Sequence, residues 1–234
     1  MGMIDFIGKC LLIDKKLLVI GDLHLGYGES LRRSGIYLPG NLYSAIEKDL
    51  LEIFVRIGKV DKIILLGDVK HAIGNILEQE RNHFARLFEL LSGRCSEIIV
   101  IKGNHDALLE PILRDYSTKL VSFYIWERYA FIHGDRDFDE IYDKKIMTWV
   151  MGHAHPAVNL SDGIKTENYK CFLTGKYKGK EIVIMPSFFP FTEGSDPRDL
   201  GIGMPWNFNF NQFKVKIVGE KLEVLDFGKL KSIS

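Results

Sequence analysis

Seven polar residues of this sequence belong to types that bind metal ions, and each follows an apolar run. They are carboxylates, imidazoles and one carboxamide, with no thiol among them: Asp22, His24, Asp68, Asn104, His133, His153 and His155. Carboxylate, imidazole and amide oxygen are the ligands expected for borderline divalent ions such as manganese, iron or zinc, whereas softer sites use thiolates. The set therefore predicts a metal centre.

The spacing of these residues predicts how they reach an ion. Asp22 and His24 are separated by one residue, and so are His153 and His155. Because alternate residues leaving a strand point to the same side, both members of each pair can reach one centre. A glycine lies beside each ligand block, which lets the backbone turn sharply and approach an ion closely. We expect a dinuclear site.

The elements that must position these groups begin with three apolar runs in the first half of the chain. The runs are Leu17–Asp22, Ile63–Asp68 and Ile98–Asn104, and each is typical of a buried strand. Apolar residues recur at helical spacing between them, at Ile46, Leu50, Ile53 and Ile57 and again at Phe84, Leu87, Phe88 and Leu91. Strand and helix alternation predicts parallel crossovers, with a ligand site beyond the carboxyl ends of the strands.

The second half of the chain predicts a second sheet that packs against the first. Short apolar runs are expected to form its strands at Tyr129–His133, Thr148–Gly152 and Glu181–Pro186, followed by a pair at 213–218 and 221–227. The stretch 186–205 contains glycine and proline and predicts a surface loop near the site or a flexible connection. The terminal strand pair is also a candidate surface for a homodimer.

Composition limits the kind of protein. A chain of 234 residues with 46% hydrophobic and 26% charged residues predicts one ordinary globular domain over 1–234. Its formal net charge is zero and its pI is about 7.1, which excludes a strongly basic nucleic-acid-binding body. Any nucleic-acid contact must be a local patch, because phosphate neutralisation supplies most non-specific affinity for DNA.

Cysteine usage and the N-terminus predict a cytoplasmic protein without membrane contact. Cys10, Cys95 and Cys171 lie far apart, so neither a disulfide framework nor a thiolate zinc site is indicated. The first ten residues, MGMIDFIGKC, contain an early acid and no apolar run of signal-peptide length. Nothing downstream has the apolar length needed to span a bilayer.

Five short blocks together resemble the calcineurin-like metallophosphoesterase family, in order, across roughly residues 17–160. The blocks are Asp22-Leu23-His24, Gly67-Asp68, Gly103-Asn104-His105-Asp106, His133-Gly134 and Gly152-His153-Ala154-His155. The resemblance implies an α/β fold, specifically a four-layer α-β-β-α sandwich of two mixed sheets. It also implies a hydrolase of phosphoric esters with two divalent metal ions, manganese being expected and iron, zinc, nickel and magnesium being alternatives.

The resemblance further assigns the ligands. Asp22, His24 and His155 would hold the first ion, Asn104, His133 and His153 the second, and Asp68 would bridge them. Two ions about 3.5–4 Å apart activate a shared water and offset charge during in-line displacement.

Two residues beside the predicted ligands have expected roles of their own. His105 would stay unligated and donate a proton or a hydrogen bond to the phosphate or leaving group. Asp106 is expected either to orient that imidazole or to be the N-cap of the segment that follows.

One departure from the family pattern narrows the function. Many members carry an acid three residues after the bridging aspartate, whereas here His71 takes that position. A histidine there resembles the SbcD-type DNA-repair nucleases, which implies that His71 assists departure of the leaving nucleotide. An imidazole suits that task because its pKa lies near the working pH. A generic surface or helix-start histidine is the alternative for His71, and His83 is expected to face solvent.

Substrate and partners follow from the same resemblance. The blocks at 22–26, 67–71 and 186–194 are similar to small SbcD-related phosphoesterases, including the group encoded with DNA ligases and helicases, so a DNA-repair partner is expected. The larger nucleases continue into a DNA-capping domain, and none is expected within 1–234. Basic residues near the ligands predict a local phosphate-binding rim: Arg32, Arg33, Lys70, Lys102 and Arg136.

Three functions follow from these features. The leading prediction is a phosphodiesterase, with a nuclease acting on nucleic acid or nucleotide diesters as one form of it. The alternatives are a phosphomonoesterase or cyclic-nucleotide hydrolase at the same site, and a non-catalytic scaffold that binds another protein. The scaffold is disfavoured because every ligand position and His105 are filled.

Overall fold

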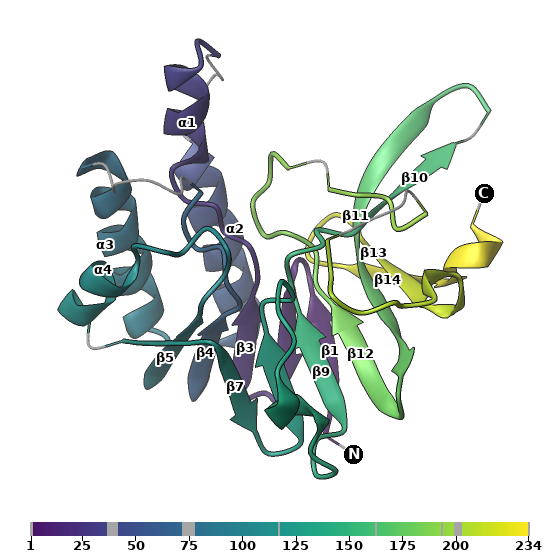
Figure 1. Ribbon diagram of the computed structural model, residues 1–234. Helices are drawn as coiled ribbons and strands as arrows, with labels where there is room; N and C mark the ends of the chain where they lie inside the picture. Colours follow the sequence, from purple (N-terminus) through teal and green to yellow (C-terminus); the bar gives the residue numbers. More distant parts are fainter. Residues whose placement is uncertain are drawn as a thin grey trace.

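The structure of the 234-residue chain is a computed structural model in which two β-sheets pack face to face (Figure 1). It describes residues 2–36, 42–71, 78–116, 118–161, 163–192, 194–198 and 203–233. The predicted class, α/β with two mixed sheets, is confirmed. Within the described ranges, no helix has the length and apolarity that crossing a bilayer would require.

The first sheet has six strands in sequence order, with antiparallel pairing from β1 to β3 and parallel pairing from β3 to β6. The strands are β1 (Ile4–Ile7), β2 (Cys10–Ile13), β3 (Leu17–Ile20), β4 (Lys62–Leu65), β5 (Glu97–Ile101) and β6 (Lys119–Val121). The three apolar runs predicted as strands are confirmed as β3, β4 and β5. The hairpin of β1 and β2 was not predicted.

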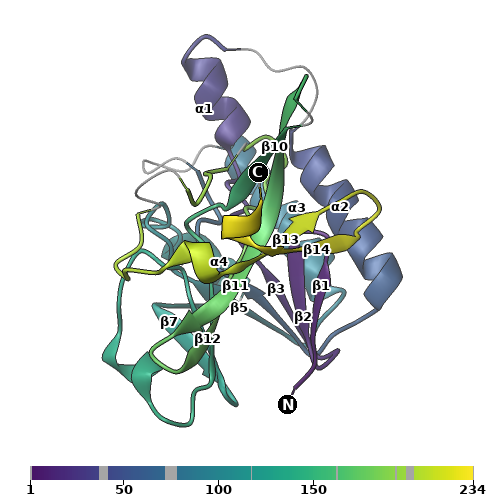
Figure 2. The ribbon, with the colours of Figure 1, turned by 90° about the vertical axis from the view of Figure 1, so that its right-hand side faces the viewer.

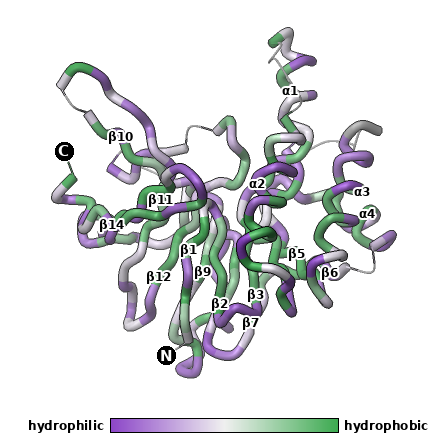
Figure 3. Tube along the Cα trace, turned by 180° about the vertical axis from the view of Figure 1, so that it is seen from behind, coloured by the Kyte–Doolittle hydropathy of each residue, from purple (hydrophilic) through white to green (hydrophobic). Residues whose placement is uncertain are grey.

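The apolar runs are continuous because both faces of this sheet are covered. In β3, Leu17 and Val19 pack between the two sheets, whereas Leu18 and Ile20 pack under the helices. Figure 3 shows the hydrophobic residues running along the central strands of the molecule. Alternate residues therefore serve two separate cores, and neither face of the strand tolerates a polar side chain.

The four α-helices belong to the first half of the described chain, and α2, α3 and α4 lie on the outer side of the first sheet (Figure 1). They are α1 (Tyr27–Arg33), α2 (Leu42–Ile57), α3 (Glu78–Ser92) and α4 (Glu110–Asp115). The predicted helical stripes are confirmed. Their residues are fully buried, except Ile57, which is partly buried, and they share one core with the helix-facing side of β3.

The second sheet has the order β14-β13-β11-β12-β9-β8-β7, with β10 paired to β11. The strands are β7 (Phe123–Trp126), β8 (Tyr129–Ile132), β9 (Thr148–Met151), β10 (Ala157–Ser161), β11 (Thr166–Tyr177), β12 (Lys180–Ile184), β13 (Lys214–Val218) and β14 (Val224–Lys229). Strands β8, β9 and β12 are parallel. The hairpin of β10 and β11 extends beyond the sheet (Figure 2).

The outer layer on the second sheet is thin. In the described part of the chain it consists of coil and three short 3-10 helices: η1 (Asp139–Tyr142), η2 (Phe210–Gln212) and η3 (Leu230–Ser232). Trp206 and Phe208 join Ile141 and Leu230 in the core beneath this layer. Aromatic side chains thus supply the apolar cover that α-helices supply on the opposite side.

Burial along α2 gives a direct test of the core. Leu50 is fully buried, whereas its neighbour Leu51 is 41% exposed. Leu50→Ala is expected to lower the free energy of unfolding by about 2–5 kcal/mol, because it removes apolar contacts and leaves a cavity. Leu51→Ala should change it by no more than about 0.5 kcal/mol. Urea denaturation followed by circular dichroism measures both, and equal losses would contradict this packing.

Candidate metal centre

All seven predicted ligands lie in loops that leave the carboxyl ends of strands. Asp22 and His24 follow β3, Asp68 follows β4 and Asn104 follows β5. The other three come from the second sheet, after β8 and β9: His133, His153 and His155. Both sheets end at the same edge of the molecule, so groups more than a hundred residues apart in sequence converge there.

A first cluster consists of Asp22, His24 and His155, whose ligand atoms lie close enough together to hold an ion. His155 Nε2 is 3.0 Å from Asp22 Oδ1 and 3.2 Å from His24 Nε2. Atoms bound to one ion at about 2.0–2.2 Å lie about 2.8–3.6 Å apart, because that is the edge of an octahedral or tetrahedral shell. The donor types and their spacing both fit a divalent ion.

A second cluster consists of Asp68, His133 and His153. His133 Nε2 is 3.4 Å from Asp68 Oδ2 and 3.1 Å from Asn104 Oδ1. The opposite ring nitrogen, Nδ1, donates to the Leu66 carbonyl oxygen at 3.0 Å. This bond fixes a proton on Nδ1 and turns Nε2 towards the other donors, which is the usual orientation of a metal-binding histidine.

Most of the predicted ligands have an unusual backbone conformation. Five of the seven have left-handed φ angles although none is glycine: Asp22 at 46°, His24 at 45°, Asp68 at 46°, His153 at 65° and His155 at 45°. Such conformations cost on the order of 1–3 kcal/mol each and persist only where the surroundings impose them. Strain at this density marks a functional site, and no sequence pattern reveals it.

Hydrogen bonds between the loops impose this conformation. His24 N–H donates to the Asp68 carbonyl oxygen at 2.9 Å, and Leu25 N–H donates to the Val69 carbonyl oxygen at 2.8 Å. His153 N–H lies 3.2 Å from Asp22 Oδ1. The loops after β3 and β4 are therefore joined backbone to backbone, and the loop after β9 is joined to them through the Asp22 carboxylate.

The predicted need for glycine is confirmed at three positions. A β-carbon at Gly67 would collide with the ring of His133, and one at Gly103 would collide with the carboxylate of Asp68. At Gly152 it would lie 2.5 Å from Asp22 Oδ2. Each glycine thus makes room for a ligand that belongs to another loop.

Electrostatics keep both carboxylates ionised. Burial alone would raise the pKa of Asp22, but the adjacent His155 and His133 lower it. The pKa of Asp68 is likewise lowered against the effect of burial, by its hydrogen bond with His133. Burial lowers the pKa of His24 to about 3, so that imidazole is neutral. These are the protonation states that metal ligands require.

The raised pKa of His133 shows that the two buried carboxylates require a positive charge between them. Although burial would lower its pKa, the hydrogen bond with Asp68 and the charge of Asp22 raise it to about 9. In the metal-free chain this imidazolium is a positive charge between two buried carboxylates. A metal ion would supply that charge in its place and release the proton.

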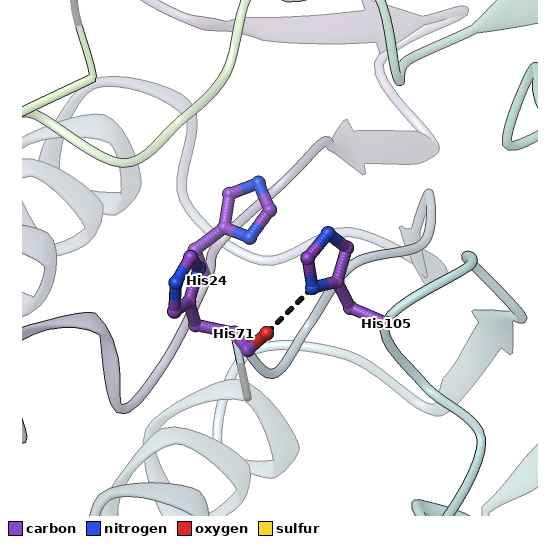
Figure 4. A group of neighbouring side chains, drawn as sticks. All are labelled: His24, His71 and His105. Atoms are coloured by element: carbon purple, nitrogen blue, oxygen red, sulfur yellow. Dashed lines mark hydrogen bonds between the residues drawn. The ribbon is translucent and has the colours of Figure 1, made fainter. Parts of the chain in front are cut away.

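His105 and His71 stand beside the first cluster and form an imidazole group with His24 (Figure 4). His105 Nδ1 donates to the His71 carbonyl oxygen at 2.5 Å, which leaves Nε2 as the atom free to face a substrate. The ring of His71 lies 5.4 Å from that of His24 and 5.5 Å from that of His105, between centroids. The ring of His71 therefore lies against the first cluster.

Asp106 does neither of the two things predicted for it. Its buried carboxylate accepts hydrogen bonds from the backbone N–H of Gly103 at 2.9 Å and of Lys70 at 3.2 Å. The His105 imidazole is held by the His71 carbonyl instead, and α4 begins only at Glu110 without a side-chain cap. Burial raises the pKa of Asp106 to about 6. The residue ties the loop after β5 to the loop after β4.

Two further predictions are corrected by burial. Lys70 is fully buried, so it cannot belong to a surface rim, whereas Lys102 and Arg136 are exposed. His83 does not simply face solvent, because its ring stacks on Tyr43 with centroids 4.6 Å apart. Both errors arise because partners from other elements, rather than neighbours in sequence, decide which side chains are covered.

The stretch after β12 was predicted as a surface loop, but its first part is buried beneath the site. Phe188 N–H donates to the Gly21 carbonyl oxygen at 3.0 Å, and Ser187 Oγ donates to that of Asp22 at 3.0 Å. Lys170 Nζ in turn donates to the carbonyl oxygens of Ser187 and Phe189. This segment supports the first ligand loop from behind. Of the predicted loop, residues 193 and 199–202 lie outside the described residues.

Comparison with known proteins agrees with this geometry. Residues 15–219 match the family described as calcineurin-like phosphoesterase. The chain belongs to that family, and with its two His/Asp clusters it is a metallophosphoesterase, an enzyme that hydrolyses phosphoric esters. No curated protein sequence matches the chain significantly.

Solved structures share the fold at low identity. The nuclease MPE of Pseudomonas putida matches with a TM-score of 0.64 at 16% identity, covering 97% of this chain and 100% of that one. Wild-type Vps29 of Entamoeba histolytica, complexed with Zn²⁺, matches with a TM-score of 0.41 at 14% identity, covering 91% and 99%. The first likeness shows a shared fold alone.

Gly103 allows a test of how tightly the site is packed. Gly103→Ala is expected to displace the Asp68 carboxylate and sharply reduce the manganese bound per chain, measured by mass spectrometry after loading. Gly93→Ala is the control, because its β-carbon would meet nothing closer than 3.6 Å and neither glycine has a positive φ. Equal metal content in the two variants would contradict the steric account.

Proposed function

We propose that this chain is a dinuclear metal-dependent phosphodiesterase that cleaves nucleic acid or nucleotide diesters. The observation that carries the proposal is the position of His71, which lies within the imidazole group beside the metal-binding clusters. The Pseudomonas putida protein of the same fold is a nuclease. We propose the same substrate class here on the strength of His71, not of that likeness.

The proposed ligand sets follow the clusters. Asp22, His24 and His155 would hold one ion, and Asn104, His133 and His153 the other. Asp68, which faces His133 with one oxygen and His105 N–H with the other at 2.9 Å, would lie between them. Manganese is the expected metal, with iron, zinc, nickel and magnesium as alternatives. When bound, such ions supply an activated water and neutralise charge on the phosphate.

His105 and His71 have separate proposed tasks. Since the Nδ1 proton of His105 is held by a carbonyl, only Nε2 can contact the phosphate, and that atom lies 3.9 Å from Asp68 Oδ2. His105 therefore orients the phosphate from the side of the bridging carboxylate. His71, whose ring centroid lies 5.5 Å from that of His105, would protonate the departing oxygen, which an alkoxide leaving group requires.

We also propose a domain organisation, a subgroup of the family, a location and partners for the chain. Residues 1–234 would act as one domain, because a single buried core joins β3 and β4 to β8 and β9. We also propose the small SbcD-related group, a cytoplasmic location and a DNA-repair partner, all on the motif resemblance alone. A homodimer would use β14, which ends its sheet and exposes Leu225 and Phe227.

Asp68→Ala tests the bridging role. Loss of a carboxylate shared by both ions is expected to abolish binding of two manganese ions per chain, measured by mass spectrometry on gel-filtered protein. Asp61→Ala is the matched control, because this exposed aspartate lies just before β4 whereas Asp68 lies just after it. Two ions retained by Asp68→Ala would show that the residue does not bridge them.

His71→Ala tests the diesterase mechanism through the leaving group. With metals retained, cleavage of a thymidine dinucleotide, which expels an alkoxide, should slow by about 100-fold or more. Cleavage of bis-p-nitrophenyl phosphate should slow much less, because p-nitrophenolate departs without a proton. Equal losses on both substrates would remove His71 from the leaving-group side.

Wild-type turnover decides between the proposed function and its alternatives. Metal-stripped protein with manganese added back should hydrolyse bis-p-nitrophenyl phosphate faster than p-nitrophenyl phosphate. The reverse order would make the chain a phosphomonoesterase, and selective cleavage of a cyclic nucleotide would make it a cyclic-nucleotide hydrolase. Protein that takes up no metal and turns over none of these esters would be a scaffold.

A further inference from the structure

A cavity of about 150 Å³ opens directly beside the first cluster, between the ligand loop and helices α1, α2 and α3. Its walls are mainly apolar and aromatic, with Tyr27, Leu42, Tyr43, His83 and Phe189 among them. His24 also lines the cavity. One side chain thus belongs both to the metal-binding cluster and to the cavity wall, so any molecule bound in the cavity lies next to the reacting phosphate.

One wall of the cavity is a rigid stacked pair. The rings of Tyr43 and His83 are parallel within 4°, with centroids 4.6 Å apart. The guanidinium of Arg86 lies 4.9 Å from the Tyr43 ring centroid and pairs with Glu47 at 2.5 Å. These contacts hold the tyrosine from α2 and the histidine from α3 in one orientation, and neither takes part in the proposed chemistry.

The other wall joins the cavity to the imidazole group. Tyr27 packs edge to face against His71 at 4.5 Å and against Phe189 at 5.1 Å, between ring centroids. Phe189 comes from the segment that supports the first ligand loop, and its N–H donates to the Asp22 carbonyl oxygen at 3.2 Å. This second wall is therefore fixed to the site itself.

Size and chemistry define the ligand. An apolar cavity of about 150 Å³ is large enough for one benzene ring, and aromatic walls favour a flat π-system. Stacking of a nucleic-acid base on an aromatic side chain contributes about 1–3 kcal/mol. Glu29 and Arg32, which pair at 3.6 Å, also line the cavity and offer polar groups to the edge of such a ring.

We propose that this cavity binds the base of a nucleotide adjoining the scissile phosphate, with preference for a single-ring base. The inference rests on the proposed phosphodiesterase function and adds a substrate class to it. A base stacked and paired within a duplex cannot enter a cavity of this size. The preferred substrates are then single strands, frayed ends and short nucleotide diesters rather than intact duplex.

The test is binding of three phosphates to the manganese-loaded full chain by isothermal titration calorimetry. Thymidine 5′-monophosphate should bind about 5-fold to 150-fold more tightly than deoxyribose 5-phosphate, which lacks the base, as stacking of about 1–3 kcal/mol requires. Deoxyadenosine 5′-monophosphate should bind more weakly than the thymidine compound. Equal affinity for the thymidine compound and the base-free sugar phosphate would overturn the proposal, and a purine preference would overturn its single-ring part.

Two variants test whether the affinity for the base arises in this cavity. Leu42→Trp fills the cavity from a half-exposed position, and His83→Ala removes one member of the stacked pair. Each variant should bring the affinity for thymidine 5′-monophosphate closer to the affinity for deoxyribose 5-phosphate. Leu51→Trp is the control, since it places the same side chain on an exposed face of α2 outside the cavity. An unchanged ratio in both folded cavity variants would also overturn the proposal.

Turnover separates this proposal from the function on which it rests. If the chain cleaves diesters but shows no preference for a base, the proposed function stands and the proposed role of the cavity fails. If the chain cleaves no diester, yet Leu42→Trp removes its preference for thymidine 5′-monophosphate, the role of the cavity stands and the proposed function fails.

Discussion

Two carboxylates, Asp22 and Asp68, are buried where both sheets end, and their unscreened charge is the constraint on which the rest of the site depends. Removing a carboxylate from water costs several kcal/mol unless a cation or hydrogen-bond donors offset it. Here imidazoles and backbone N–H groups surround the two acids, and His133 holds a proton between them. A site built in this way binds divalent cations because it is incompletely neutralised without them, and metal binding should therefore stabilise the fold.

The strain in the ligand loops follows from the same constraint. Five of the proposed ligands adopt left-handed backbone conformations so that their side chains converge, and glycines at 67, 103 and 152 leave space for that convergence. The strands that precede these loops offset the free-energy cost of this strained backbone. Since β3, β4 and β5 are covered on both faces, their ends are held firmly enough to keep strained loops in place. Rigid support of this kind is what pre-organises a catalytic site.

Much of this arrangement could be predicted from the sequence because three of its signals are local. Apolar runs predicted β3, β4 and β5, helical spacing predicted α2 and α3, and ligand type predicted the residues of both clusters. The spacing argument was right for Asp22 and His24, but His153 and His155 lie in different clusters and not at one centre. The hairpin of β1 and β2 was missed although a two-residue turn at Gly8 and Lys9 separates its short apolar strands. Lys70, Asp106 and the cavity could not be predicted, because burial and contact there depend on elements far apart in sequence. Tyr27, Tyr43 and Phe189 share no periodic pattern, yet they enclose one space.

The central claim is that the two clusters each hold an ion, with Asp68 between them. Anomalous X-ray diffraction from crystals grown with manganese tests it most directly. The account predicts two peaks about 3.5–4 Å apart, one among Asp22, His24 and His155 and the other among Asn104, His133 and His153, with the Asp68 carboxylate touching both. A single peak, or peaks that leave Asp68 without contact to a metal, would contradict it.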